Sequence, residues 1–215
     1  TTGKAAHGST PEDGENAISI LMSNLYENKK CRLSEFFRRF IGLEFNGKSL
    51  GGYCCDSASG EATYNIGRIE TVNDLINLFV DVRYPVTVDI NSIIKEINNN
   101  LYNNGFGEIK AELISNKPSV YMDKEGSVIK ELLSAYQEHT GDMSSPTVIG
   151  GGTYARAMDG IVAFGPMLPG RELTEHQANE YIFEKDLYLA KEIYKTAIKN
   201  LLRMYLSFRS KVYFH

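Results

Sequence analysis

The sequence predicts an α+β protein built from two successive domains, residues 1–119 and 120–215. The first domain is predicted from the order of its apolar patterns, which is helix, strand, strand, helix, strand. That order is what remains of a ferredoxin-like split-βαβ sandwich if one strand precedes Thr1. The boundary is predicted from a change of composition at 116–119, where Pro118 also blocks continuation of a strand.

The first two helices are predicted from a capping signal and an apolar stripe. Ser9 or Thr10 can cap a helix whose first position is Pro11, where the missing amide hydrogen has no helical partner to lose. Apolar residues at helical spacing then carry this helix to about Tyr26. A second, shorter helix is expected at 33–41.

Two paired strands follow an irregular, glycine-rich stretch. Residues 61–70 and 75–83 have the composition of strands, and Asn73 and Asp74 between them are typical turn residues. The alternation of 75–83 directs its aliphatic side chains, from Ile76 onward, to one face. The other face carries Asn77, Phe79, Asp81 and Arg83. Arg83 is therefore expected at a strand end, on the face that points away from the core.

A helix and a strand complete the first domain. Asp89 or Asn91 can start a helix with an isoleucine-rich face. This helix is expected to end near Asn104 and Gly105, because a left-handed cap forms easily there. Residues 108–114 then have the pattern of a strand.

The second domain is predicted to contain two helices, at 126–138 and at the C-terminal end. Short strands at 147–149 and 161–164 are expected between them. The final helix should bury one face, because apolar residues recur along it at helical spacing. These residues are Leu187, Ala190, Tyr194, Ala197, Leu201 and Met204.

Composition excludes several classes of protein. With 215 residues and 42% hydrophobic side chains, the chain can bury cores. A net charge of −4 with interspersed basic residues argues against nucleic-acid binding. No apolar run approaches the roughly 20 residues that cross a bilayer. The 3 cysteines are too few and too poorly spaced for a disulfide framework, which favours a reducing cytoplasm.

A run of glycines at 150–152 precedes Thr153 and Arg156. The run superficially fits a dinucleotide-binding fingerprint, but no helix opens behind it within a βαβ unit, and there is no P-loop lysine. Two interpretations remain: a tight structural turn, or an anion site in which glycine amides approach the ligand. We favour the anion site, with a hydroxyl from Thr153 and a bidentate guanidinium from Arg156.

Two histidines lie in loops that precede helices. His176 occupies a polar loop before the final helix, where a neutral imidazole could bind a metal. One histidine is not a metal site, because catalytic zinc usually takes three protein ligands and keeps an open position. The sequence has no catalytic pairing of carboxylates and histidines that would supply the rest. His7, taken alone, is more typical of a helix entry than of a catalyst.

Three stretches in this order change that interpretation: residues 3–17 around His7, the segment 80–85 that contains Arg83, and the glycine loop with 176–181. Together they resemble the PepV-type dipeptidases, members of the large family of dinuclear-zinc aminopeptidases, carboxypeptidases and aminoacylases. The resemblance spans nearly the whole chain. In that family a catalytic domain carries two zinc ions, and an inserted lid domain closes over the substrate.

The resemblance implies a role for each candidate residue. His176 would be the last zinc ligand in chain order, and His7 would be the lid histidine that stabilises negative charge on the scissile carbonyl oxygen. Residues 1–119 would be part of the lid, and 120–215 the C-terminal part of the catalytic domain. The terminal carboxylate of the dipeptide substrate would be held by Arg83, Gly152, Thr153 and Arg156.

The same resemblance implies that the chain is one piece of a longer enzyme. The family's His-x-Asp motif, bridging aspartate, paired glutamates and remaining acidic ligand all belong to a segment upstream of Thr1. This missing N-terminal catalytic segment is therefore an expected partner, and the chain alone is expected to be inactive. The alternatives are an aminoacylase or succinyl-diaminopimelate-type deacylase, and a metal-free peptide-binding or assembly module. The oligomeric state stays open.

Overall fold

The computed structural model describes residues 1–165, 167–172, 174 and 178–209, and the chain separates into two compact units. The first unit consists of Thr1–Pro118 with Val148–Gly152, and the second of Ser119–Thr147 with Thr153–His215. Helices and small antiparallel sheets occur together, so the predicted α+β content is confirmed.

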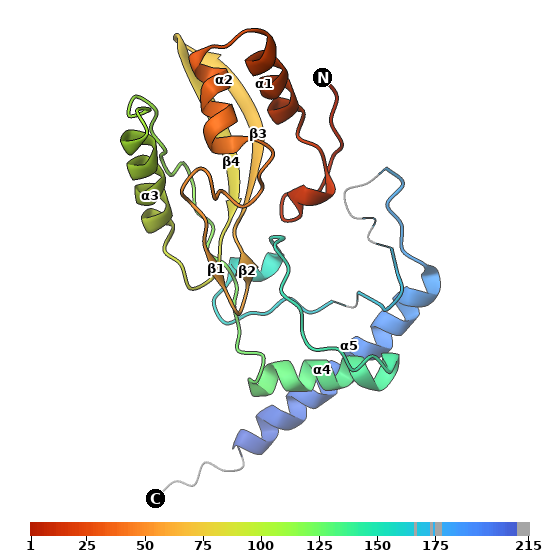
Figure 1. Ribbon diagram of the computed structural model, residues 1–215. Helices are drawn as coiled ribbons and strands as arrows, with labels where there is room; N and C mark the ends of the chain where they lie inside the picture. The colour runs from red at the N-terminus through yellow and green to blue at the C-terminus, as the bar shows by residue number, and fades with distance from the viewer. Residues whose placement is uncertain (166, 173, 175–177, 210–215) are drawn as a thin grey trace, which may run out of the picture. The chain divides into compact units, whose positions relative to one another are not determined.

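A long β-hairpin organises the first unit (Figure 1). Strands β3 (Thr63–Val72) and β4 (Leu75–Arg83) pair antiparallel, as their composition predicts. Asn73 and Asp74 join them with φ angles of 49° and 62°, and two left-handed residues give the tight turn that matches the twist of paired strands. Ile76 was expected on the core face, but it is exposed because it lies next to this turn.

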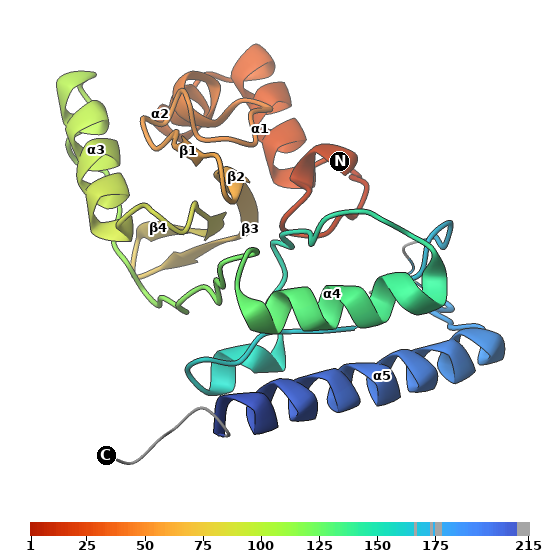
Figure 2. The same ribbon diagram turned by 90° about the horizontal axis from the view of Figure 1, so that it is seen from below.

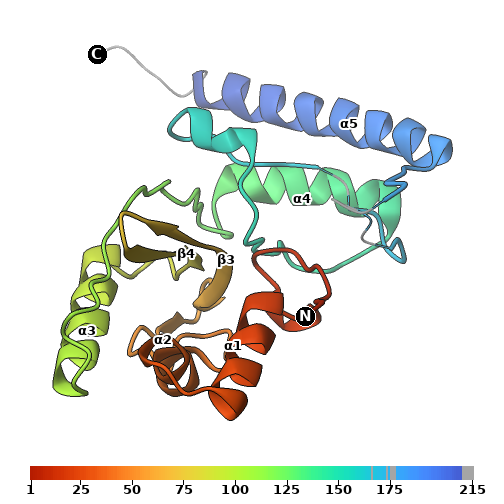
Figure 3. The same ribbon diagram turned by 90° about the horizontal axis from the view of Figure 1, so that it is seen from above.

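Helices pack with the apolar face of the hairpin (Figure 3). They are α1 (Ala17–Asn28), α2 (Arg32–Phe36), which continues as a π-helical turn over Phe37–Ile41, and α3 (Ile90–Asn103). The hairpin and the helices share one core, so the first unit has its own hydrophobic interior. Its main buried members are Met22, Phe36, Phe37, Phe40, Tyr64, Ile66, Ile93, Ile97, Leu101 and Phe106.

Helix α1 begins later than the sequence predicts. Pro11 opens only a single 3-10 turn, Pro11–Asp13, and the side chain of Thr10 makes no capping bond. The cap is Asn16, whose Oδ1 accepts hydrogen bonds from the amides of Ile18 and Ser19 at 3.0 and 3.2 Å. Its Nδ2 also donates to the carbonyl of Ile66 at 2.7 Å, so the cap ties α1 to β3.

Three predicted strands do not form: within the described residues, 108–114, 147–149 and 161–164 are irregular. A strand is stable only where a neighbouring strand completes its hydrogen-bond ladder. At Ala111 the side chain of Asn98 stands in for that neighbour, because it accepts from the amide and donates to the carbonyl, each at 2.9 Å. The prediction of these three strands was wrong because none of them has a pairing partner among the described residues. The ferredoxin-like split-βαβ sandwich stays a prediction.

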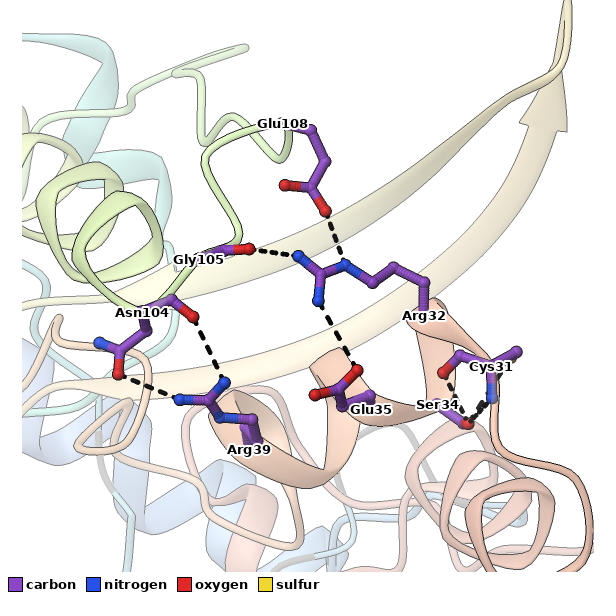
Figure 4. A network of polar contacts seen from close by, with 8 residues as sticks. All are labelled: Cys31, Arg32, Ser34, Glu35, Arg39, Asn104, Gly105 and Glu108. Atoms are coloured by element: carbon purple, nitrogen blue, oxygen red, sulfur yellow. Dashed lines mark hydrogen bonds and ion pairs between the residues drawn. The ribbon is translucent and has the colours of Figure 1, made fainter.

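Two arginines fix the C-terminal end of α3 (Figure 4). Arg32 donates from Nε to Glu108 at 2.8 Å and from Nη2 to the carbonyl of Gly105. Arg39 donates to the side-chain and backbone oxygens of Asn104 at 3.1 and 3.3 Å. Basic side chains suit this place because the last carbonyls of a helix lack partners and carry partial negative charge. The two contacts attach α3 to α2.

A small second sheet, β1 (Cys55–Asp56) with β2 (Gly60–Glu61), is held by the carboxylate of Asp56. Hydrogen bonds from the Ser59 amide, followed by the Ser59 hydroxyl and Thr87, lower the pKa of Asp56 to about 2. Because the pKa falls on folding, Asp56 stabilises the fold fully above its unfolded pKa of roughly 4 and loses this effect as pH falls toward 2.

The expected result is a loss of stability between pH 4 and pH 2 that Asp56→Asn reduces. Urea unfolding at a series of pH values measures it, and Asp13→Asn, at an exposed carboxylate, serves as the matched control. An unchanged pH dependence in the Asp56 variant would contradict this assignment.

Two antiparallel helices, α4 (Ser127–Thr140) and α5 (Glu184–Arg209), pack together in the second unit (Figure 2). The His139 ring contacts the Thr196 hydroxyl at 2.8 Å between them. Their shared core is small, with Leu132, Ala135 and Ala197 at its centre. None of the helices described here is long and apolar enough to cross a membrane.

Candidate active site

His7 lies in a loop that the backbone closes at its base. Lys4 and Glu15 exchange two backbone hydrogen bonds of 3.0 and 2.9 Å, which bring the ends of the loop together. Within the loop, the amide of Thr10 donates to the carbonyl of His7 at 3.0 Å. The histidine is therefore held in a defined turn before α1, as its sequence context predicts.

Ser9 fixes the tautomer of the His7 ring. The backbone amide of Ser9 donates to Nδ1 at 3.2 Å, and the Ser9 hydroxyl lies 2.7 Å from the same nitrogen. An atom that accepts an amide hydrogen cannot carry one, so the proton of the neutral ring is assigned to Nε2. His7 thus has the form that can donate a hydrogen bond from Nε2.

Arg83 is the last residue of β4, as predicted, and its guanidinium is fixed on two sides. Nη1 donates to the carbonyl of Gly150 at 3.1 Å, and Nη2 donates to Oδ2 of Asp81 at 2.6 Å. The buried Nε atom has no hydrogen-bond partner among the described residues, and neither has Oγ1 of Thr63, which lies opposite Arg83 in the sheet. Unpartnered buried polar atoms are uncommon, and a water molecule or another polar group would satisfy them here.

The glycine loop brings His7 and Arg83 to one place in the first unit. A Cβ atom on Gly150 would lie 2.2 Å from Cβ of Ser9, so the loop backbone touches the histidine turn. A Cβ atom on Gly151 would lie 3.9 Å from Nε2 of His7. Residues 7, 83 and 150–151 are far apart in sequence, yet they converge within one compact unit.

These contacts predict different outcomes for two neighbouring alanine substitutions. Gly150→Ala should displace Ser9 and disturb the His7 ring, because a separation of 2.2 Å is too short for two carbon atoms. Gly151→Ala should leave the ring in place, because its new contacts of 3.8 and 3.9 Å are ordinary. Chemical shifts of the His7 ring measure the effect, and equal perturbation by both variants would contradict the assigned geometry.

An open cavity of about 580 Å³ adjoins this site in the first unit. Its lining includes Ser9 and Thr63, which contact or face the site residues, together with Glu12, Glu44 and Glu61.

The rest of the predicted carboxylate group is divided between the two units. Gly152 is exposed in the first unit, whereas Thr153 and Arg156 belong to the second. Thr153 caps the 3-10 helix Tyr154–Ala157, and its hydroxyl accepts from the amide of Ala155 at 3.3 Å. The side chain of Arg156 is exposed. Thr153 thus has the structural role that the tight-turn interpretation gives it, and its role in binding stays a prediction.

The predicted metal ligand His176 lies outside the described residues, but the ends of its loop are described. Arg171 makes a bidentate contact with Asp186 at the start of α5, with distances of 2.5 and 2.8 Å. This contact holds the pKa of the buried Asp186 carboxyl below its usual range. Thr174 donates to the carbonyl of Tyr181 at 3.4 Å. Arg171 thus ties the segment before the loop to the start of α5, and Thr174 contacts the segment after it.

Within the described part of the chain, no three His, Cys, Asp or Glu side chains are grouped to hold a metal ion. The described residues by themselves therefore do not fit a zinc centre. Ser9 was expected as a possible helix cap, but it contacts the His7 ring instead. The contacts of Asp81 with Arg83 and of Asp186 with Arg171 were not predicted. Ser9 could have been found from its place two residues after His7, whereas the Arg171 to Asp186 contact has no sequence signal.

No protein-family profile matches the chain. Individual proteins do, and two from Staphylococcus aureus carry the name "Putative dipeptidase". The protein of strain USA300 is 36% identical over 204 residues, and that of strain MRSA252 is 37% identical over 205 residues. Each match covers 93% of this chain but only 43% of the relative, so the chain spans less than half of their length. The similarity extends over most of the chain.

Proposed function

We propose that this chain is the substrate-binding part of a dipeptidase. One observation carries the proposal: His7 and Arg83 converge on the glycine loop, in a chain that is similar over 93% of its length to proteins named as dipeptidases. A histidine donor next to a cationic anchor is what a dipeptide requires, because its peptide carbonyl and its terminal carboxylate are only a few bonds apart.

Each residue would act on a different oxygen of the substrate. The Nε2 hydrogen of His7 would stabilise the negative charge that develops on the carbonyl oxygen during attack by water. Arg83 would bind the terminal carboxylate, with Gly152, Thr153 and Arg156 as further candidates. In the parent protein two zinc ions would supply the activated water, with His176 as the ligand contributed by this chain. A cytoplasmic location belongs to the proposal, because Cys31, Cys54 and Cys55 are free thiols.

The chain alone would not complete the reaction, and the missing N-terminal catalytic segment would be its partner. Support comes from α5, whose apolar side chains continue beyond the α4 contact onto an open face. A 26-residue helix with such a face suits burial against further structure. The exposed residues of this stripe are Leu187, Ile198 and Leu202.

Ile198→Gln is expected to weaken association with a separately produced upstream segment by about tenfold, because it removes apolar area from the centre of the stripe. Lys199→Gln is the matched control, since it introduces the same side chain at the next, polar position. Titration calorimetry measures both affinities. Equal weakening by the two substitutions would show that the stripe is not the contact.

A substrate panel tests the proposed reaction. The chain is extended upstream to the length of its relatives and offered a dipeptide, the same dipeptide as a C-terminal amide, an N-acyl amino acid and succinyl-diaminopimelate. Preference for the free dipeptide supports the proposal. Preference for an acylated substrate would instead identify an aminoacylase or deacylase, and peptide binding without turnover or zinc would identify a binding module.

A further inference from the structure

We propose that Asp81 is a built-in competitor for the substrate carboxylate and that it thereby limits the affinity of Arg83 for ligands with a free carboxylate. The inference rests on the proposed function in one respect, because it takes Arg83 as the carboxylate anchor. It adds a residue that tunes the affinity for the substrate carboxylate through this anchor.

The hydrogen bonds of Arg83 are the first argument. A guanidinium binds a carboxylate best through two parallel N–H groups. In this structure Nη2 already donates to Asp81 at 2.6 Å and Nη1 donates to Gly150 at 3.1 Å, while Nε is buried. Each terminal nitrogen carries two hydrogens, so each keeps one N–H for a further acceptor. A substrate carboxylate that binds Nη2 must nevertheless share this nitrogen with Asp81 or displace it.

The negative charge of Asp81 makes its contact with Arg83, rather than the Gly150 contact, the one that a substrate carboxylate replaces. Asp81 neutralises Arg83, and a second carboxylate at the same nitrogen would be repelled by it. The side chains of Arg83 and Asp81 are 31% and 48% exposed, so water can solvate Asp81 when it leaves. Exposed ion pairs contribute little, which makes the exchange for another carboxylate easy. A ligand without a carboxylate offers no replacement and leaves the pair closed.

The turn that carries His7 comes close to the carboxylate of Asp81. The neighbouring turn has Gly8 where a Cβ atom would lie 3.3 Å from Oδ2 of Asp81, which is a tight contact. Because Gly8 has no side chain, the histidine turn comes this close to the carboxylate without a clash. Asp81 therefore lies next to both the Arg83 guanidinium and the histidine turn.

NMR titration of the chain with alanylalanine and with alanylalaninamide tests the inference without turnover. Asp81→Asn should strengthen binding of alanylalanine by about two- to fivefold and leave binding of the amide unchanged. Asp81→Glu, which keeps the charge, should resemble the unsubstituted chain. Dispersed spectra establish that each variant is folded.

Weaker, unchanged or undetectable binding of alanylalanine to the Asp81→Asn variant would overturn the inference, because Asp81 would then position Arg83 rather than compete with the ligand. Arg83→Gln separates this failure from failure of the proposed function. If Arg83→Gln abolishes the difference between the two peptides, the anchor stands. If it changes neither affinity, Arg83 is not the anchor, and the proposed binding role falls together with the inference.

Discussion

Replacing His7 with alanine in the upstream-extended protein is expected to lower kcat for dipeptide hydrolysis by about 10²- to 10³-fold, the usual effect of removing one oxyanion donor. The reason is that Nε2 carries the ring proton, since Nδ1 accepts from the Ser9 amide at 3.2 Å. The donor is thus set before substrate binds. Such a group acts mainly on the transition state, so KM should change much less than kcat.

Steady-state kinetics of three variants check this prediction. Ser9→Ala keeps the backbone amide but removes the hydroxyl that lies 2.7 Å from Nδ1, so a smaller loss of kcat is expected. Arg83→Gln should instead act mostly on KM, because it removes binding of the carboxylate. A His7→Ala variant with unchanged kcat, or with an effect on KM alone, would show that His7 does not stabilise the developing charge.

Phe106→Ala is expected to destabilise the chain by about 3–5 kcal/mol, the range for truncating a fully buried phenylalanine. Phe106 has no exposed surface, and its ring packs edge to face against Phe40 with centroids 5.2 Å apart. The guanidinium of Arg32 lies over the same ring, 3.5 Å from its centroid. Truncation would therefore leave a cavity at the point where α2 meets the end of α3.

Urea unfolding of the chain measures this loss, and Phe79→Ala is the matched control. Phe79 lies on the polar face of the hairpin under Arg68, 3.9 Å from its guanidinium, and is partly exposed. Its truncation should cost clearly less than that of Phe106, because the Phe79 ring is already partly in contact with water. Similar losses for the two variants would contradict the placement of the core.

The hairpin and helix α3 were predictable because their sequence signals are local. Asn73 and Asp74 tolerate left-handed backbone angles, and strict alternation in β4 fixes which side chains face the core. Asp89 caps α3, where its side chain accepts from the amide of Asn91 at 3.0 Å. In each case neighbours in sequence determine the conformation.

The site was only partly predictable, because its contacts join distant residues. The resemblance to zinc dipeptidases gave His7 and Arg83 their expected roles, but the contact between Arg83 and Gly150 spans 67 positions and has no periodic signal. The prediction of a strand at 108–114 was wrong for a similar reason. Its strand pattern is visible in the sequence, whereas the presence of a pairing partner is not.

The central claim is that this chain binds the dipeptide but needs an upstream segment for catalysis. Zinc content and dipeptide hydrolysis, measured side by side for the isolated chain and for the upstream-extended protein, test it most directly. We expect zinc and turnover only in the extended protein. Equal hydrolysis by the isolated chain would contradict the account.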